Sequence, residues 1–158
     1  MAFEEYIEDS IQELKRAEHL IFVSLKYTRT VDVIKSIINR LIDAYNFILE
    51  GMLLELKKKK VIDEIPTAPK LRAEIVKQGY PQDTMIPELL NLYLLLRQLN
   101  RAEYVQVHEF RRQVAMIAKI DGREFTVNID TISAYYAMTK DFITHIKKTY
   151  AKKQDETK

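Results

Sequence analysis

Hydrophobic residues recur at steps of three and four along most of the chain, the spacing that brings side chains onto one face of a helix. The first such stretch runs from Phe3 to about Tyr27, and the second, with the clearest period, runs from Val31 to Lys60. A short helix is expected over Lys70 to Gln78, and another from near Pro87 through Leu99. These patterns predict helices, with the second as the central core helix.

The boundary of the second helix is marked at both ends. The break at Lys26 to Thr30 predicts a helical hairpin, and Thr30 or Asp32 is suited to cap the helix that follows. At the other end, Lys57 to Lys60 places four cations at the negative end of the helix dipole. We interpret the lysine run as a solvated helix end, with a contact to RNA or a partner as the alternative.

The period changes to strict alternation after residue 112. Apolar residues alternate on either side of Asp121-Gly122, a dipeptide that favours a tight hairpin turn. We therefore expect a β-hairpin over about residues 112–129. Asp130 or Thr131 is then suited to cap a last helix, which runs to Tyr150.

Together these elements predict a mainly α fold: a four-long-helix up-down bundle with a short connecting helix and a β-hairpin inserted before the last helix. A chain of 158 residues suits one domain. We assign residues 1–150 to a single helical bundle domain and residues 151–158 to a flexible polar tail.

The composition indicates the cellular compartment of the protein but says little about its chemical activity. The chain has no cysteine, which excludes disulfides and thiolate sites and favours a reducing compartment. No secretory signal is visible, and no apolar run approaches the ~20 residues of a membrane span. We expect a soluble cytoplasmic protein. The net charge of +2 does not by itself indicate nucleic acid binding.

The stretch NRAEYVQVHEFRR, residues 100–112, follows the apolar run of the Pro87 helix. If the helix continues through it at about 100° per residue, one polar face of about 80° collects several basic residues, while apolar residues lie broadly opposite. The polar set is Arg97, Arg101, Tyr104, His108 and Arg111, and the apolar set is Leu92, Leu95, Leu99, Ala102 and Phe110. Alternatively, the strand region begins before Val105 and separates these residues.

Arginine and histidine on one face suggest a phosphodiester site. A guanidinium binds phosphate oxygens in pairs, and an imidazole near its ordinary pKa transfers a proton at neutral pH. Tyr104 is suited to hydrogen-bond or stack on a base. The competing interpretation is a solvated polar face without chemistry.

The chain resembles the HEPN superfamily of helical domains. The resemblance rests on Arg101-x6-His108, which fits the family's Arg-x(4 to 6)-His pattern at its long end, on the amphipathic second helix IINRLIDAYNFILEGML, and on the helical plan. It implies a homodimer in which the motifs of two protomers meet in a cleft, with metal-independent RNA cleavage or RNA binding. By this resemblance Arg101 would bind phosphate and His108 would act as general acid or base, while Arg97, Tyr104 and Arg111 would contact the substrate.

Other functions remain open. The sequence has none of the usual enzyme motifs, since it lacks a glycine-rich phosphate loop and a serine nucleophile motif. The main alternative is a non-catalytic interaction or scaffold module, which forms a homodimer through its hairpin and second helix; a small-ligand-binding bundle is a third. Some relatives in the HEPN superfamily work with a nucleotidyltransferase-like companion, which we note as a further partner.

Several single residues have simpler interpretations. We expect His19 and His145 to be partly exposed structural histidines, and no metal or cofactor site is assigned. Glu103 and Glu109 are expected to pair with nearby arginines along the helix. Tyr27-Thr28-Arg29-Thr30 is interpreted as a turn and cap, with an anion site at the helix N-terminus as the alternative.

Overall fold

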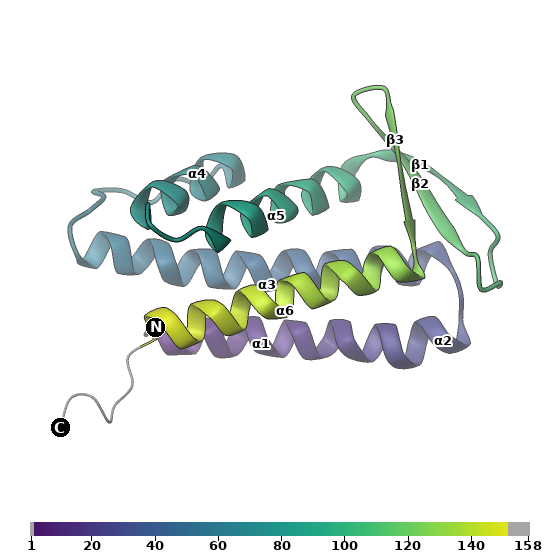
Figure 1. Cartoon of the computed structure of the whole chain (residues 1–158), viewed down its shortest axis with the longest axis horizontal. Coiled ribbons are helices and arrows are strands. Elements are labelled where there is room, and N and C mark those ends of the chain that lie inside the picture. The colour runs from purple at the N-terminus through teal and green to yellow at the C-terminus, as the bar shows by residue number, and fades with distance from the viewer. Residues whose placement is uncertain (1, 152–158) are drawn as a thin grey trace.

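The computed structural model describes residues 2–151 and is mainly helical, with one small antiparallel sheet (Figure 1). The expected tail at 151–158 lies outside the described residues except for Ala151. The elements are α1 Phe3–His19, a π-helical turn η1 Leu20–Ser24, α2 Leu25–Tyr27, α3 Val31–Lys58, α4 Pro69–Gly79, α5 Met85–Arg101, β1 Glu103–Val107, β2 Ala115–Ile120, β3 Arg123–Asn128 and α6 Ile129–Tyr150. No helix within residues 2–151 is both long and apolar enough to cross a membrane.

α3 is the core helix, as its period predicts. Its N-cap is Thr30, whose side-chain oxygen accepts a hydrogen bond from the Val33 amide. α1, α4, α5 and α6 all pack against it. Within this core, the ring of Tyr45 lies 5.4 Å from the rings of both Tyr93 and Phe142 (centroid distances), which joins α3 to α5 and α6. Because α3 is buried along most of its length, it leaves little surface for another chain.

α1 runs antiparallel to α3 as the first half of the predicted helical hairpin (Figure 1). The helices approach closely at Gly51, where an added Cβ would lie 2.9 Å from Phe3 Cδ1 and from Tyr6 Cβ. A larger residue there would force the start of α1 away from α3. The predicted continuous helix to Tyr27 is interrupted only by the π-helical turn η1.

The β2–β3 hairpin confirms the predicted one. Asp121 and Gly122 form its turn with φ of 52° and 77°, the left-handed angles that this dipeptide favours. β1 adds a third, antiparallel strand, and the order is β1-β2-β3. Tyr104, Ala118 and Phe125 are paired across the register and share the face that packs on the helices with Met116, two residues before Ala118. Val105, Ile117 and Thr126 lie on the opposite face.

The cap of α6 differs from the expectation. Asn128, rather than Asp130 or Thr131, is the N-cap, and its side-chain oxygen accepts a hydrogen bond from the Thr131 amide at 2.8 Å. The helix begins earlier because β3 pairs with β2 up to Asn128 and runs directly into α6. An asparagine at this junction ends the strand and starts the helix without an intervening loop.

Candidate functional site

Two of the predicted site residues, Arg97 and Arg101, lie together on α5. With Gln98 and Leu94 they line a cavity of about 360 Å³, whose other wall is Ala68 to Lys70 at the start of α4. The Arg97 guanidinium also lies 5.8 Å from the centroid of the Tyr93 ring. Within residues 2–151, no carboxylate forms an ion pair with Arg97, Arg101 or Lys70. The groove therefore carries three cations whose charge a bound anion would neutralise.

Of the two interpretations of residues 100–112, the structure confirms that the strand region begins before Val105, and not that the helix continues beyond Arg101. α5 ends at Arg101, Ala102 is extended with ψ of 151°, and β1 begins at Glu103. The reason is tertiary. Val105 and Val107 favour a strand, and pairing of this strand with β2 stabilises it more than continuation of the α5 helix would. Consequently Tyr104, His108 and Arg111 do not share the α5 face with Arg97 and Arg101.

Tyr104 lies on the inner face of the sheet, half-buried against the core. The Lys35 ammonium lies 4.6 Å from the centroid of its ring and donates a hydrogen bond to the Asn100 carbonyl at 3.5 Å. The ring is thus held between the helices and a cation from α3. This position favours a structural role for Tyr104 at the start of β1 over the predicted contact with a substrate.

His108 opens the loop between β1 and β2, and this loop is fastened to the start of α3. Phe110 donates its amide hydrogen to the Arg29 carbonyl at 2.6 Å, and the Glu109 carboxylate accepts from the Val31 amide at 3.2 Å. Glu109 is therefore an added cap of α3, which corrects the expected pairing with arginines on its own helix. The α2–α3 turn acts as the anchor of the loop, and both lie at one end of the molecule (Figure 1).

The backbone of this loop is unusual. His108 and Phe110 have φ of 55° and 67°, a left-handed conformation that costs non-glycine residues about 1 kcal/mol or more each. His108, Arg111 and Arg112 are exposed, and so is Phe110, at 75%. The expectation that Phe110 joins the apolar core side is wrong, because the residue belongs to a loop and not to a helix.

Arg101 and His108 stand beyond opposite ends of β1. At about 3.3 Å per residue the strand spans roughly 13 Å from Glu103 to Val107, and each residue lies outside that span. One phosphate group contacts both side chains only if they approach within a few ångströms. Within one chain, the length of β1 therefore separates Arg101 from His108.

A second cluster of titratable groups joins α5 to α6. The side chain of Asp83 is only 7% exposed, and its Oδ2 accepts hydrogen bonds from His145 Nε2 at 2.7 Å and from the Tyr150 hydroxyl. Its Oδ1 accepts from the Met85 and Ile86 amides at the start of α5. His145 is thus a half-buried member of a pair, and its Nδ1 lies 3.4 Å from the Thr149 hydroxyl.

The pKa of Asp83 reflects these contacts. Burial by itself would raise it, but the hydrogen bonds from Tyr150, His145 and the Ile86 amide outweigh burial and hold the pKa below its ordinary value of 3.8. Burial and the bond to Asp83 raise the pKa of Tyr150. Asp83 precedes a predicted helix, a sequence signal for a cap, but no local pattern links it to His145, 62 residues away. The four contacts are all internal, so the cluster is a structural clamp.

Replacement of Asp83 by alanine is expected to lower the free energy of unfolding by about 2–4 kcal/mol, since it removes a helix cap and two charge-assisted hydrogen bonds. Because the pKa is depressed in the folded state, this contribution is present above about pH 4 and is lost as the pH falls further. Urea unfolding at about pH 7 and about pH 3 measures the difference. Asp141→Ala, an exposed aspartate on α6, is the control; an equal loss there would contradict the clamp.

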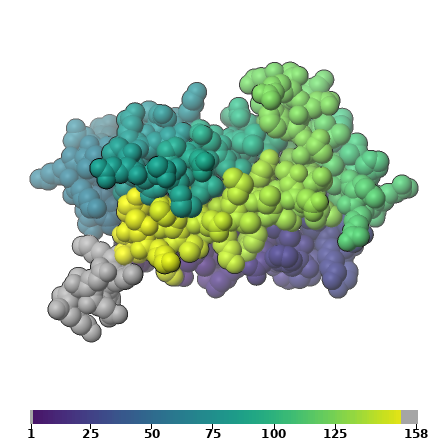
Figure 2. All heavy atoms as spheres, in the orientation of Figure 1, coloured from purple at the N-terminus to yellow at the C-terminus, as the bar shows by residue number. Residues whose placement is uncertain are grey.

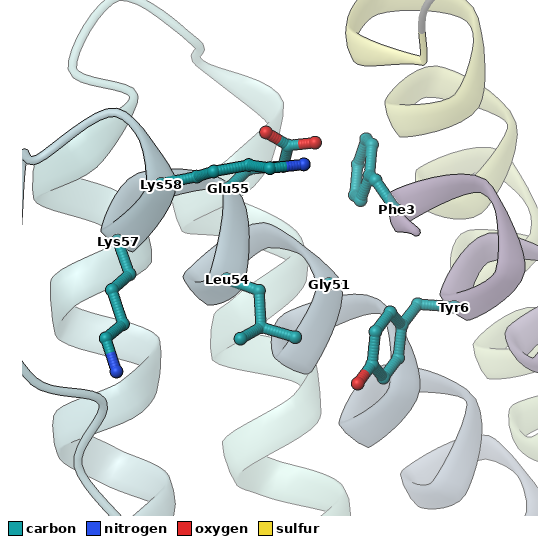
Figure 3. Close-up of a pocket in the computed structure, with 7 residues that line it drawn as sticks. All are labelled: Phe3, Tyr6, Gly51, Leu54, Glu55, Lys57 and Lys58. Atoms are coloured by element: carbon teal, nitrogen blue, oxygen red, sulfur yellow. The ribbon is translucent and has the colours of Figure 1, made fainter. Parts of the chain in front are cut away.

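The cavity of about 480 Å³ between α1 and the end of α3 is drawn in Figure 3. Phe3, Tyr6 and Leu54 form its apolar walls; Glu55 and Lys58 extend toward Phe3, while Lys57 points away. Lys57 to Lys60 are exposed, as expected for a solvated helix end. This cavity lies at the far end of α3 from the β1–β2 loop, so it belongs to a different surface (Figure 1).

His19 is exposed at the end of α1, where it lines a shallow groove with Arg16 and Arg40. Within residues 2–151, no three histidine, aspartate or glutamate side chains gather as metal ligands do. The chain matches no protein-family model, and the comparisons with curated proteins and with solved structures found no match. The proposals below therefore rest on the geometry of the molecule.

Proposed function

We propose that the protein is a dimeric RNA-binding protein, HEPN-like in its use of an arginine and a histidine, and that its two Arg101–His108 sites form between protomers and cleave RNA without metal. The observation that carries the proposal is the position of these residues beyond opposite ends of β1, an edge strand. The packing of α1, α3, α5 and α6 around one core supports an up-and-down bundle as the scaffold of each protomer.

β1 is available to pair with another chain. Its backbone forms ladder hydrogen bonds with β2 on one side, and within the described residues no other backbone hydrogen bond involves Glu103–Val107. Such an edge is a template for a strand of a second molecule. The central side chain, Val105, is 58% exposed, although valine favours a paired and covered strand.

Antiparallel pairing of two β1 strands about a twofold axis has a simple register. If the axis passes through Val105, the middle residue of β1, the whole strand is paired, and Glu103 of one protomer faces Val107 of the other. Ala102 then faces the partner's His108, and Arg101 faces the partner's Glu109. This register sets Arg101 opposite the partner's Glu109, with opposite charges, and places Arg101 and the partner's His108 at the same end of the paired strands.

The chemistry of the assembled site follows from these two side chains. The RNA 2′-hydroxyl attacks the adjacent phosphorus, the O2′–P bond forms, and the P–O5′ bond breaks, which leaves a 2′,3′-cyclic phosphate and a 5′-hydroxyl. Arg101 would bind the phosphate oxygens as negative charge builds on them. His108 would either take the proton from O2′ or give one to O5′, with water serving the other oxygen. Arg97 and Lys70 would bind a neighbouring phosphate in the α4–α5 groove.

The alternative is a homodimer with no chemistry. Its expected interface of hairpin and second helix needs revision, because α3 is largely buried and the sheet edge is the part exposed to another chain. The alternative predicts the same dimer but no RNA binding. A nucleotidyltransferase-like companion is the other proposed partner, and the exposed edge of β1 favours a second copy of this chain over it.

The direct test is to incubate the protein with a mixed pool of RNA in the presence of EDTA. We expect the RNA to bind and to be cut, with 2′,3′-cyclic phosphate at the new ends. Binding without cutting would remove the catalytic part of the proposal. A protein that dimerises but neither binds nor cuts RNA would be the non-catalytic scaffold.

A further inference from the structure

We propose that the β1–β2 loop and the α2–α3 turn form a stacking platform for unpaired bases, so that the nucleic acid bound is single-stranded RNA. In the loop the platform consists of His108 to Arg112, and in the turn of Lys26 to Arg29. The inference rests on the proposed function for its ligand, RNA; the surface shares His108 with the proposed cleavage site, but its aromatic rings, Phe110 and Tyr27, are separate from that site. Arg101 and the groove on α5 bind phosphate, whereas this surface would bind bases.

The two most exposed aromatic rings among the described residues belong to this surface. Tyr27 is 78% exposed and Phe110 is 75% exposed. Their segments are in direct contact, because the Phe110 amide donates to the carbonyl of Arg29, two residues after Tyr27. Leaving such rings in water forgoes roughly 1.5–3 kcal/mol of burial for a side chain the size of phenylalanine. A base, whose π-face stacks on an aromatic ring, would cover them.

The loop holds Phe110 outward at a cost. The left-handed backbone at His108 and Phe110 is maintained by the hydrogen bonds to Arg29 and to the Val31 amide. A glycine at either position would adopt the same angles without strain. Non-glycine residues in this conformation concentrate at ligand-binding loops. The backbone that carries the exposed ring is thus held in place, which lowers the entropy that the loop loses when a ligand stacks on the ring.

The surface around the rings is cationic. Lys26, His108, Arg111 and Arg112 are exposed, and within residues 2–151 none of them forms an ion pair. The one acidic side chain of the loop, Glu109, is engaged with the Val31 amide. Aromatic rings set among free cations are the combination by which proteins bind single strands: the cations follow the phosphates and the rings receive the bases. Figure 2 shows the loop region, in green, protruding at one end of the molecule.

An RNA duplex fits this surface less well. In a duplex the bases are stacked inside the helix, and a protein meets phosphates and 2′-hydroxyls. The cations would still bind the duplex, but Phe110 and Tyr27 would find no free base. A protein partner is the other ligand that exposed aromatic and arginine residues suit. The unpaired positive charges of this surface favour a nucleic acid over a protein partner, and the binding experiment below distinguishes these two ligands.

The chain has no tryptophan, so Phe110→Trp introduces a single fluorescent reporter at the platform. The probe is a short 2′-O-methyl oligouridylate, which is single-stranded and is not cut because its 2′-oxygens are blocked. Its binding is followed by anisotropy of a label on the RNA, and stacking is followed by tryptophan emission. We expect saturable quenching by this probe, and little quenching by its duplex with oligoadenylate. Phe110→Ala is expected to weaken single-strand binding about ten- to a hundredfold.

The matched control is Val61→Trp, at a position 58% exposed directly after the Lys57 to Lys60 run. This tryptophan is also surrounded by cations but lies at the other end of α3, and we expect its emission to stay unchanged. If the probe binds the parent but leaves the Phe110→Trp emission unchanged, the platform is wrong while the proposed RNA binding stands. Equal quenching by the duplex would overturn the preference for single strands. If no RNA binds the parent, both proposals fail, and the surface is left to a protein partner.

Discussion

An equal mixture of the Arg101→Ala and His108→Ala variants, refolded together, is expected to recover about one quarter of the parent's RNA cleavage, although each variant alone is almost inactive. Each variant should lose about 10²- to 10⁴-fold, since each lacks one group of the site. In a mixed dimer, one of the two sites combines the intact Arg101 of one protomer with the intact His108 of the other. Half of the dimers are mixed and half of their sites are complete, so about one quarter of the sites are restored.

This complementation separates a shared site from a site within one chain. If Arg101 and His108 acted together in one protomer, every site in the mixture would lack one of them, and no activity would return. Cleavage of a labelled RNA in EDTA measures the recovery. Arg123→Ala, which removes an exposed arginine at the hairpin turn, serves as the control and should keep the parent's activity. A mixture as inactive as its components would reject the two-chain site.

Substitution of Val105 by lysine is expected to dissociate the dimer and abolish cleavage. In the register centred on Val105, the two introduced ammonium groups face each other across the twofold axis at the distance of a cross-strand pair. Loss of the apolar pair and gain of like charges should together raise the dimer dissociation constant about tenfold or more. Because Val105 is already 58% exposed in one chain, the fold of the protomer should remain intact. Sedimentation equilibrium measures the dissociation, and thermal unfolding checks the fold.

Thr126→Lys is the matched control for this variant. Thr126 is exposed on the same face of the sheet but lies on β3, the opposite edge strand. We expect it to leave both the dimer and the activity unchanged. A parent that remains monomeric at high concentration, or a dimer disrupted by Thr126→Lys and not by Val105→Lys, would contradict pairing through β1. Since five residue pairs make a small contact, the parent dimer should itself dissociate on dilution.

The helices were predictable because their signals are local and long. The period of α3 continues over 28 residues, and every turn from Val31 to Leu56 contributes buried residues to the core. The β2–β3 hairpin was predictable from six residues on either side of Asp121-Gly122, whose preferred backbone angles are those of the turn. In both cases the residues that determine the element lie within it.

The candidate site was predictable only as a set of residue types. Arg97 and Arg101 were correctly grouped, since they lie one turn apart on a helix that does form. His108, Tyr104 and Arg111 were grouped with them by extending that helix, whereas pairing with β2 makes the next five residues a strand. β1 pairs with β2, which follows the β1–β2 loop in the sequence. A helical projection of residues 97–111 takes no account of this pairing.

By itself the sequence determined the nature of the elements: which stretches are helical, where the hairpin turns, and which faces are apolar, because propensity and periodicity act between near neighbours. Only the tertiary structure decided that β1 exists as an edge strand, that Glu109 and Phe110 are fastened to the start of α3, and that Asp83 meets His145. Asp83 and His145 are 62 positions apart in the sequence, and Glu109 and Val31 are 78 positions apart. The free energy of these contacts comes from hydrogen bonds that form only once the core has packed.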